Sequence, residues 1–165
     1  MSKTIVLAVD TARRELAGHV AAAVEMTKDV ARAGDTVVVL HVHEFAVGRF
    51  GRMQVDCADG QGESLVASIV EDLSGAGVSA EGAIREADFG HVARAILIAA
   101  YHYQARLLVL GSSSRTDLPW VPFGSVANRL LHISSLPVLI VPMRRDETVT
   151  DPSAVTGPAA VTEPA

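Results

Sequence analysis

Continuous apolar runs alternate with amphipathic segments along the chain. The runs Thr4 to Val9 (TIVLAV) and Thr36 to Val42 (TVVVLHV) are typical of strands that are buried on both faces. Arg106 to Leu110 and Pro137 to Val141 (PVLIV) predict two more such strands. Val78 to Glu86 (VSAEGAIRE) alternates apolar and polar residues, which predicts a strand with one exposed face at the edge of a sheet.

The amphipathic segments predict four helices. In the first, apolar residues recur at helical spacing from Leu16 to Ala31, and Gly34 ends the helix. The other three are expected at Glu63 to Leu73, Gly90 to Tyr103 and Gly124 to His132. Glu44 to Gly60 has no clear period, and we interpret it as a long loop.

This alternation of strands and helices predicts an α/β protein. We expect a three-layer α/β/α sandwich with an open five-stranded parallel sheet. The length of 165 residues suits one domain, which we place at residues 1–145. Residues 146–165 are rich in Pro, Ala, Thr and Val without a period, and we expect a disordered tail there.

Charge and composition exclude several classes of partner. The net charge is −5 and no block of like charge occurs, so we expect neither nucleic acid nor a membrane surface as a partner. No apolar run approaches the ~18 residues that a membrane span needs. The N-terminus leads directly into a strand, and Cys57 is the single cysteine, so we expect a cytoplasmic protein.

Two strand ends and one helix start mark the expected ligand site. Open α/β sheets bind ligands at the carboxyl ends of the strands where strand order reverses, which here is between Asp10 and Gly111 if the first and fourth strands are neighbours. Asp10 either contacts a ligand or caps the following helix. Gly111 can turn with positive φ, and Gly124 and Ser125 open a helix whose N–H groups suit an anion. Neither a P-loop nor a G-x-G-x-x-G motif is present.

Other reactive residues give weaker signals. His41 and His43 share one face of a strand and could hold a metal, but no third ligand is evident, and we expect none. Cys57 lies beside Asp56 and Asp59, which would raise the pKa of its thiol and argue against a nucleophile. No catalytic triad can be assembled, so no catalytic residue is assigned.

Most of the chain resembles the universal stress protein family, and the last third carries the most specific part of the resemblance. The resemblance is carried by Asp10 at a strand end, "LHV" at 40–42, "LLVLGS" at 107–112 and "GSVANRLLHISSLPVLIVP" at 124–142. It covers roughly residues 3–143 and implies the adenine nucleotide α-hydrolase-like fold. Nucleotide-binding members carry a loop G-x2-G-x9-G-S/T, and Ser114 stands here in place of its middle glycine.

The resemblance implies a site for ATP, with or without Mg²⁺, and at most slow hydrolysis. Its nucleotide-binding residues would be Val9, Asp10, Val42, Leu110, Gly111, Ser114, Gly124, Ser125 and Val126. If the position of Ser114 needs positive φ, serine costs on the order of 1 kcal/mol there, which weakens binding several-fold. If the backbone must instead pass tightly by the phosphate, the serine Cβ would clash.

Two alternatives stay open. The protein is either a stress-response regulator that binds a nucleotide, or an interaction protein of the same fold whose loop is degenerate. An ATP-using enzyme of the wider fold group is disfavoured, because no S-G-G-x-D-S loop follows the first strand. The strand Pro137 to Val141 would invite pairing with a second chain if it lies at an edge, so we expect a homodimer through it.

Overall fold

The fold is described from a computed structural model, which covers residues 3–11, 17–58, 60–112 and 124–142. The expected tail, Ser114 and most of the loop before Gly124 lie outside the described residues. The strands are β1 (Thr4–Val9), β2 (Thr36–Gly48), β3 (Gly51–Gln54), β4 (Ser79–Asp88), β5 (Ala105–Ser112) and β6 (Val138–Pro142). The helices are α1 (Ala17–Val30), α2 (Gln61–Gly75), α3 (Val92–His102) and α4 (Ser125–Ile133).

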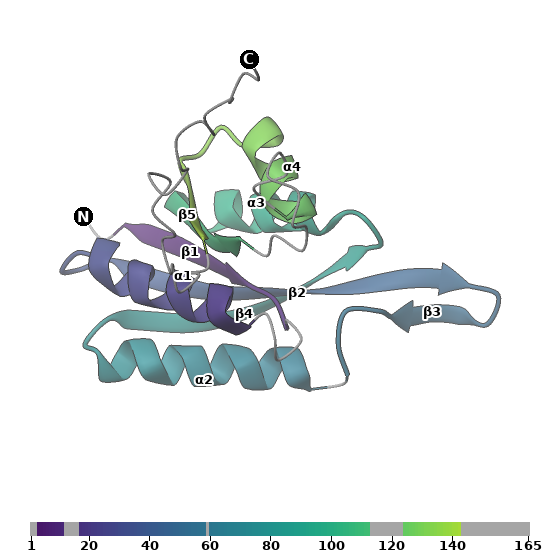
Figure 1. The fold of residues 1–165 in the computed structure, drawn as a ribbon, viewed down its shortest axis with the longest axis horizontal. Helices are drawn as coiled ribbons and strands as arrows, with labels where there is room; N and C mark the ends of the chain where they lie inside the picture. Colours follow the sequence, from purple (N-terminus) through teal and green to yellow (C-terminus); the bar gives the residue numbers. More distant parts are fainter. Residues whose placement is uncertain (1–2, 12–16, 59, 113–123, 143–165) are drawn as a thin grey trace, which may run out of the picture.

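Five parallel strands form the expected open sheet, with helices on both of its faces (Figure 1). β2 pairs with β4 on one side and with β1 on the other, β1 pairs with β5, and β5 pairs with β6. The first and fourth parallel strands are therefore neighbours, which is the condition on which a site between Asp10 and Gly111 depended. β4 and β6 are the outer strands of the parallel sheet, which confirms that the alternating strand lies at an edge.

The prediction of a long loop over residues 44–60 was wrong. β2 continues to Gly48 and turns into β3, which runs antiparallel to it from Gly51 to Gln54. This sixth strand pairs with β2 beyond the end of β1, and the resulting hairpin projects from the body of the molecule (Figure 1). Val47, Phe50 and Met53 are exposed there, so the hairpin lacks the buried face that gives a strand its period of two.

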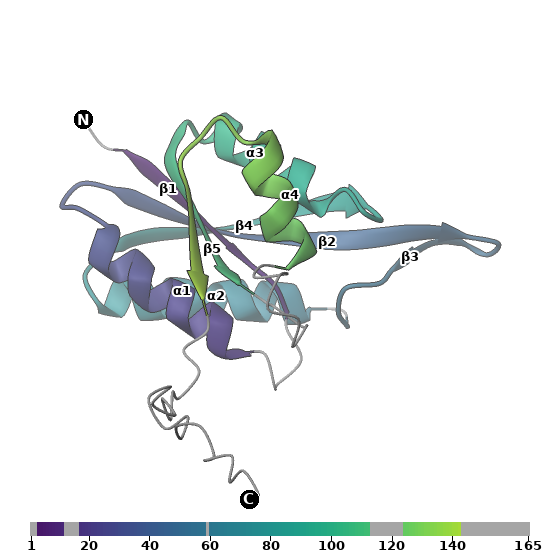
Figure 2. The same cartoon turned by 45° about the horizontal axis from the view of Figure 1, so that its top comes forward.

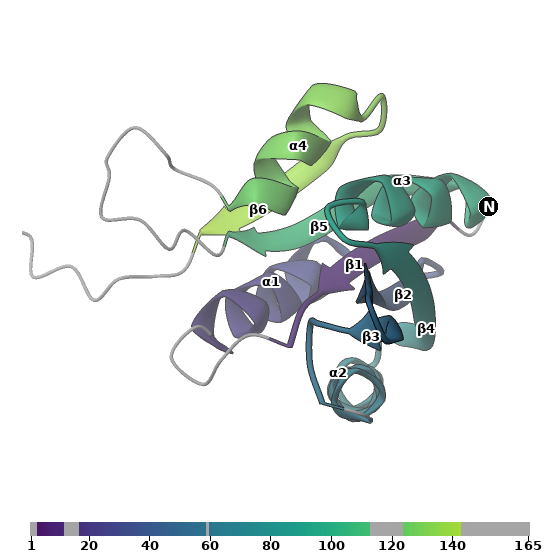
Figure 3. The same cartoon turned by 90° about the vertical axis from the view of Figure 1, so that its right-hand side faces the viewer.

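The sheet separates two apolar cores. α1 and α2 cover one face, and α3 and α4 cover the other (Figures 2 and 3). Alternate residues of β1 serve the two cores, because successive side chains of a strand point to opposite faces. Ile5 and Leu7 pack with the core under α1 and α2, and Val6 and Ala8 with the core under α3 and α4. Among the helices of the described residues, none has both the length and the apolar character needed to cross a bilayer.

Candidate functional site

The carboxyl end of β1 holds the first group of expected site residues. Val9 is buried, whereas the Asp10 side chain is 60% exposed at the end of the strand. Asp10 Oδ1 accepts a hydrogen bond from Nε2 of His19, at 2.7 Å. His19 is buried in the first turns of α1, and nothing in the sequence pattern marked it as part of the site. The Asp10 carboxylate is thus oriented by His19 and keeps exposed surface for a ligand.

Val42 lies one position beyond the last residue of β2 that pairs with β1, which is His41. Alternate residues of a strand offer their backbone groups to the same neighbour. The Glu44 N–H donates to Asp56 and its carbonyl accepts from Val55, both on the side of β1 and β3. The Val42 carbonyl therefore points to the same side, into the space past the end of β1.

Gly111 is a glycine for a reason that differs from the one expected. It lies within β5 and is absent from the residues with positive φ, so the predicted left-handed turn at Gly111 was wrong. A Cβ at this position would lie 2.4 Å from the His19 carbonyl oxygen and 2.7 Å from its ring. Gly111 thus lets α1 pack directly on β5 next to Leu110, which is buried.

The start of α4 lies at the same edge of the sheet (Figure 3). Gly124 has extended backbone, with φ −63° and ψ 165°, and its carbonyl accepts the first helical hydrogen bond from the Asn128 N–H. No side chain of the described residues caps this helix, so the backbone N–H groups at Ser125 and Val126 are available to an acceptor. Ser125 is exposed, which suits the anion-binding position expected for it.

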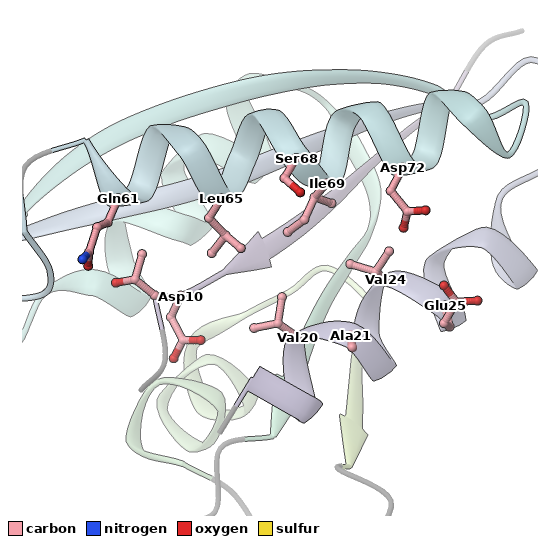
Figure 4. A pocket seen from close by; sticks show the side chains of 11 residues that line it. Asp10, Val20, Ala21, Val24, Glu25, Gln61, Leu65, Ser68, Ile69 and Asp72 are labelled. Atoms are coloured by element: carbon pink, nitrogen blue, oxygen red, sulfur yellow. The ribbon is translucent and has the colours of Figure 1, made fainter. Parts of the chain in front are cut away.

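A cavity of about 490 Å³ opens beside Asp10 and Thr11 (Figure 4). It runs between α1 and α2, past Val24, Leu65 and Ile69. Its size falls in the range of about 300–1,000 Å³ that is typical of small-molecule pockets. None of the described residues that line this cavity belongs to α4.

A cluster of four possible metal ligands lies between β2 and α2. We call it the imidazole–thiol cluster, and its members are His41, His43, Asp56 and Cys57. One ligand atom from each residue lies within 4.8 Å of the others. The third ligand that was missing in the sequence comes from the segment after β3, which brings Asp56 and Cys57 back to β2. Asp56 and Cys57 lie close to His41 and His43 in the chain. This closeness was the signal in the sequence that could have identified them as further ligands.

Hydrogen bonding controls the acidity of the cluster. Burial alone would raise the pKa of Asp56, but hydrogen bonds from Cys57 and the Glu44 N–H, together with the contacts to both histidine rings, lower it to about 2. Burial lowers the pKa of His43, but its hydrogen bonds to Glu63 and Asp56 outweigh this and raise it. Burial raises the pKa of the Cys57 thiol, and Asp56 raises it further, as the sequence predicted.

The parallel sheet, its strand order and the helices on both of its faces are those of the adenine nucleotide α-hydrolase-like fold. The profile of the universal stress protein family matches residues 1–142. The chain therefore belongs to the universal stress protein family. No curated protein sequence matches the chain.

Solved structures with the same fold include three universal stress proteins. One from Archaeoglobus fulgidus is 19% identical, covers 86% of this chain and 94% of its own, and has a TM-score of 0.63. One from Arabidopsis thaliana with AMP bound is 19% identical. The match covers 92% of this chain and 98% of that one, with a TM-score of 0.62. A universal stress protein from Archaeoglobus fulgidus in complex with dAMP is 20% identical. The match covers 84% of this chain and 97% of that one, with a TM-score of 0.58.

Proposed function

We propose that this universal stress protein is a stress-response regulator that binds ATP or a related adenine nucleotide at the carboxyl ends of β1 and β5. The observation that carries the proposal is the convergence of three features at one edge of the sheet. These are the exposed Asp10, the backbone at Gly111 and the uncapped start of α4 at Gly124. Related proteins bind AMP, dAMP and cAMP, which supports an adenine nucleotide as the ligand.

The adenosine half of the ligand would lie between β1 and β2. The Val42 carbonyl, past the end of β1, can accept a hydrogen bond from the adenine amino group. The Asp10 carboxylate can accept hydrogen bonds from the ribose hydroxyls, and its bond from His19 holds it in position. Val9 would support the adenosine from the strand end.

The phosphates would lie between β5 and α4. The first N–H groups of α4, at Ser125 and Val126, together with the helix dipole, favour negative charge at Gly124. Leu110 and Gly111 would approach the ribose and phosphates with their backbone, and Ser114 would offer an N–H and a hydroxyl. Bound Mg²⁺ would neutralise phosphate charge. No side chain of the described site is positioned as a nucleophile or general base, so we propose binding rather than catalysis.

Calorimetric titration with ATP and Mg²⁺ tests this proposal. We expect micromolar binding by the wild-type protein. A Ser114→Gly variant should bind about fivefold more tightly if the position needs positive φ, since about 1 kcal/mol of strain is removed. Ser79→Gly, at the opposite edge of the sheet, is the matched control and should bind like the wild type.

Each result has a distinct meaning. Binding only by Ser114→Gly would mean that the site is intact but that serine has removed nucleotide control from this protein. Absence of binding in all three proteins would overturn the nucleotide proposal.

The second candidate function is that of an interaction protein of the same fold, without a nucleotide. The exposed apolar side chains of the β2–β3 hairpin, Val47, Phe50 and Met53, favour it. In either case we propose a homodimer that forms through β6, whose outer backbone groups face away from β5. The cytoplasmic location that the single cysteine favours stays a prediction.

A further inference from the structure

The imidazole–thiol cluster has the spacing of a metal-binding site. Asp56 Oδ2 lies 3.0 Å from His41 Nε2 and 3.2 Å from His43 Nδ1. Cys57 Sγ lies 3.1 Å from Asp56 Oδ2, 4.0 Å from His41 Nε2 and 3.8 Å from His43 Nδ1. Tetrahedral ligands with metal bonds of about 2.0–2.3 Å stand roughly 3.3–3.7 Å apart. The four atoms lie within 4.8 Å of one another, so the side chains that stand farthest apart must move closer for all four to bind one ion.

Hydrogen bonds outside the cluster determine which nitrogen of each histidine faces inward as an acceptor. His41 Nδ1 lies 3.0 Å from the Val9 carbonyl oxygen, which can only accept, so Nδ1 carries the proton. His43 Nε2 lies 3.0 Å from Glu63 Oε1 and likewise donates to it. In neutral rings, the lone pairs of His41 Nε2 and His43 Nδ1 then point at the same carboxylate oxygen of Asp56.

Two donors already reach these acceptors: the Gln54 amide lies 2.9 Å from His43 Nδ1, and the Cys57 thiol lies 3.1 Å from Asp56 Oδ2. His41 Nε2 and Asp56 Oδ2, 3.0 Å apart, are still two acceptors that need a proton or a cation between them. A proton would place a charge on the His41 imidazole, which is only 2% exposed, and burial opposes that charge. A divalent ion instead balances the carboxylate of Asp56 and the thiolate of Cys57, which leaves the cluster itself neutral.

The groups around the cluster hold both imidazoles in the orientation that a metal site needs. Ligating histidines usually donate their other N–H to a carboxylate or a carbonyl, as His43 does to Glu63 and His41 does to Val9. Gly62, in the first turn of α2, lies directly against both rings. A Cβ there would stand 2.4 Å from the His41 ring and 2.7 Å from the His43 ring. Helix α2 thus packs directly against both imidazoles and restricts their movement.

We propose that the imidazole–thiol cluster binds one Zn²⁺ ion or a transition-metal ion of similar ligand preference. Two imidazoles, a carboxylate and a thiolate suit Zn²⁺ and not Mg²⁺, which prefers oxygen ligands. The site is therefore distinct from any Mg²⁺ that accompanies a nucleotide. With four protein ligands and no open position, it is structural: it fastens the segment after β3 to β2 and to the start of α2.

Cobalt substitution tests the proposal on the full-length protein. The protein is treated with a chelator, dialysed and titrated with Co²⁺, and then with Zn²⁺ in competition with a chromophoric chelator. We expect one ion per chain, intense visible bands of tetrahedral Co²⁺ and a near-ultraviolet thiolate-to-cobalt charge-transfer band. Zn²⁺ should displace the Co²⁺ and raise the melting temperature, because it binds only the folded state.

Variants assign the ligands. Cys57→Ser should abolish the charge-transfer band and weaken Zn²⁺ binding at least about tenfold, and Glu63→Gln should weaken it about tenfold by loosening His43. His132→Ala, an exposed histidine on α4, is the control and should bind like the wild type. Circular dichroism of each metal-free variant checks that it is folded.

Three results would overturn the proposal. They are no binding at micromolar metal, a weak octahedral Co²⁺ spectrum without charge transfer in the wild type, or equal Zn²⁺ affinity in a folded Cys57→Ser variant. The first two come from the wild-type protein alone and do not depend on any variant folding. Since ATP plays no part in these measurements, their failure is independent of the nucleotide proposal.

Discussion

Single residues at the carboxyl ends of β1 and β5 serve both packing and the proposed ligand. Gly111 stands where the family resemblance puts a phosphate contact, yet the His19 carbonyl oxygen already occupies the space that its side chain would fill. His19 in turn donates to Asp10. Loss of nucleotide binding in a Gly111 variant would therefore not identify a ligand contact by itself, because α1 would move as well.

A Gly111→Ala substitution should destabilise the protein. The new Cβ would meet backbone, which cannot swing away as a side chain can, so we expect a loss of about 1–3 kcal/mol in the free energy of unfolding. Urea denaturation measures this loss. Gly75→Ala, at the end of α2 with no atom within 4 Å of its new Cβ, is the control. It should be neutral or stabilise by up to about 1 kcal/mol. Equal stability of the two variants would contradict the packing role.

How far the sequence predicted the site depended on the signal at each residue. The places of Asp10 and Gly124 in the fold were predictable, because Asp10 follows β1 and Gly124 precedes α4. His19 was not, because a histidine on an amphipathic helix gives no sign of the partner it meets nine residues away. The positive φ expected for Gly111 was wrong. Glycine is needed there because α1 packs against it at His19, and this tertiary contact cannot be read from the local sequence.

At the scale of elements, prediction succeeded where both faces of a strand are buried. β1 was predicted at its full bounds, because five of its six residues are buried. The β2–β3 hairpin was missed, because its apolar residues Val47, Phe50 and Met53 stay exposed and leave no buried face to set a period of two. That error hid the imidazole–thiol cluster, since only the return of the chain after β3 brings Asp56 and Cys57 beside His41.

An ion pair links three elements at the amino edge of the sheet. Arg106, at the start of β5, donates from Nη2 to Asp35 Oδ2 at 2.6 Å and to the Val30 carbonyl at the end of α1. Asp35 lies just before β2 and also accepts from the Arg32 N–H. The hydrogen bond from Arg106, and then that from Arg32, lower the pKa of Asp35 below its ordinary value of 3.8.

This lowered pKa makes stability depend on pH in the acid range. The unfolded chain binds a proton more readily than the folded one, so the contribution of Asp35 is present above the unfolded pKa and is lost as pH falls through the folded pKa. Asp35→Asn should be less stable than the wild type near neutral pH, and the difference should shrink on acidification. Urea denaturation from about pH 7 to about pH 3 measures it.

Asp29→Asn removes an exposed carboxylate of α1 and controls for the loss of one negative charge. Its difference from the wild type should stay small over the same pH range. A gap between Asp35→Asn and the wild type that did not change with pH would mean that the pair with Arg106 does not lower the pKa of Asp35.

At the scale of the whole molecule, the two outer strands of the parallel sheet differ in kind. β4 has mostly exposed or half-buried side chains, which suits an edge that faces water. β6 is apolar, and its side chains pack into both cores. Its outer row of backbone groups has no strand beside it among the described residues. Two copies of β6 can satisfy these groups by antiparallel pairing across a two-fold axis.

The backbone direction of β6 gives a sharp test of the proposed homodimer. The Pro137 carbonyl accepts from the Leu108 N–H on β5, so by alternation Leu139 also faces β5, while the N–H of Ile140 faces outward. Ile140→Pro removes this N–H. Ile140→Ala is the control, because it also loses the Ile side chain beyond Cβ but keeps the N–H. We expect sedimentation at micromolar concentration to show dimers of the wild type and of Ile140→Ala, and monomers of Ile140→Pro. A monomeric wild type would refute the dimer. A dimeric, folded Ile140→Pro would move the interface away from β6, and the exposed apolar β2–β3 hairpin would be the next surface to substitute.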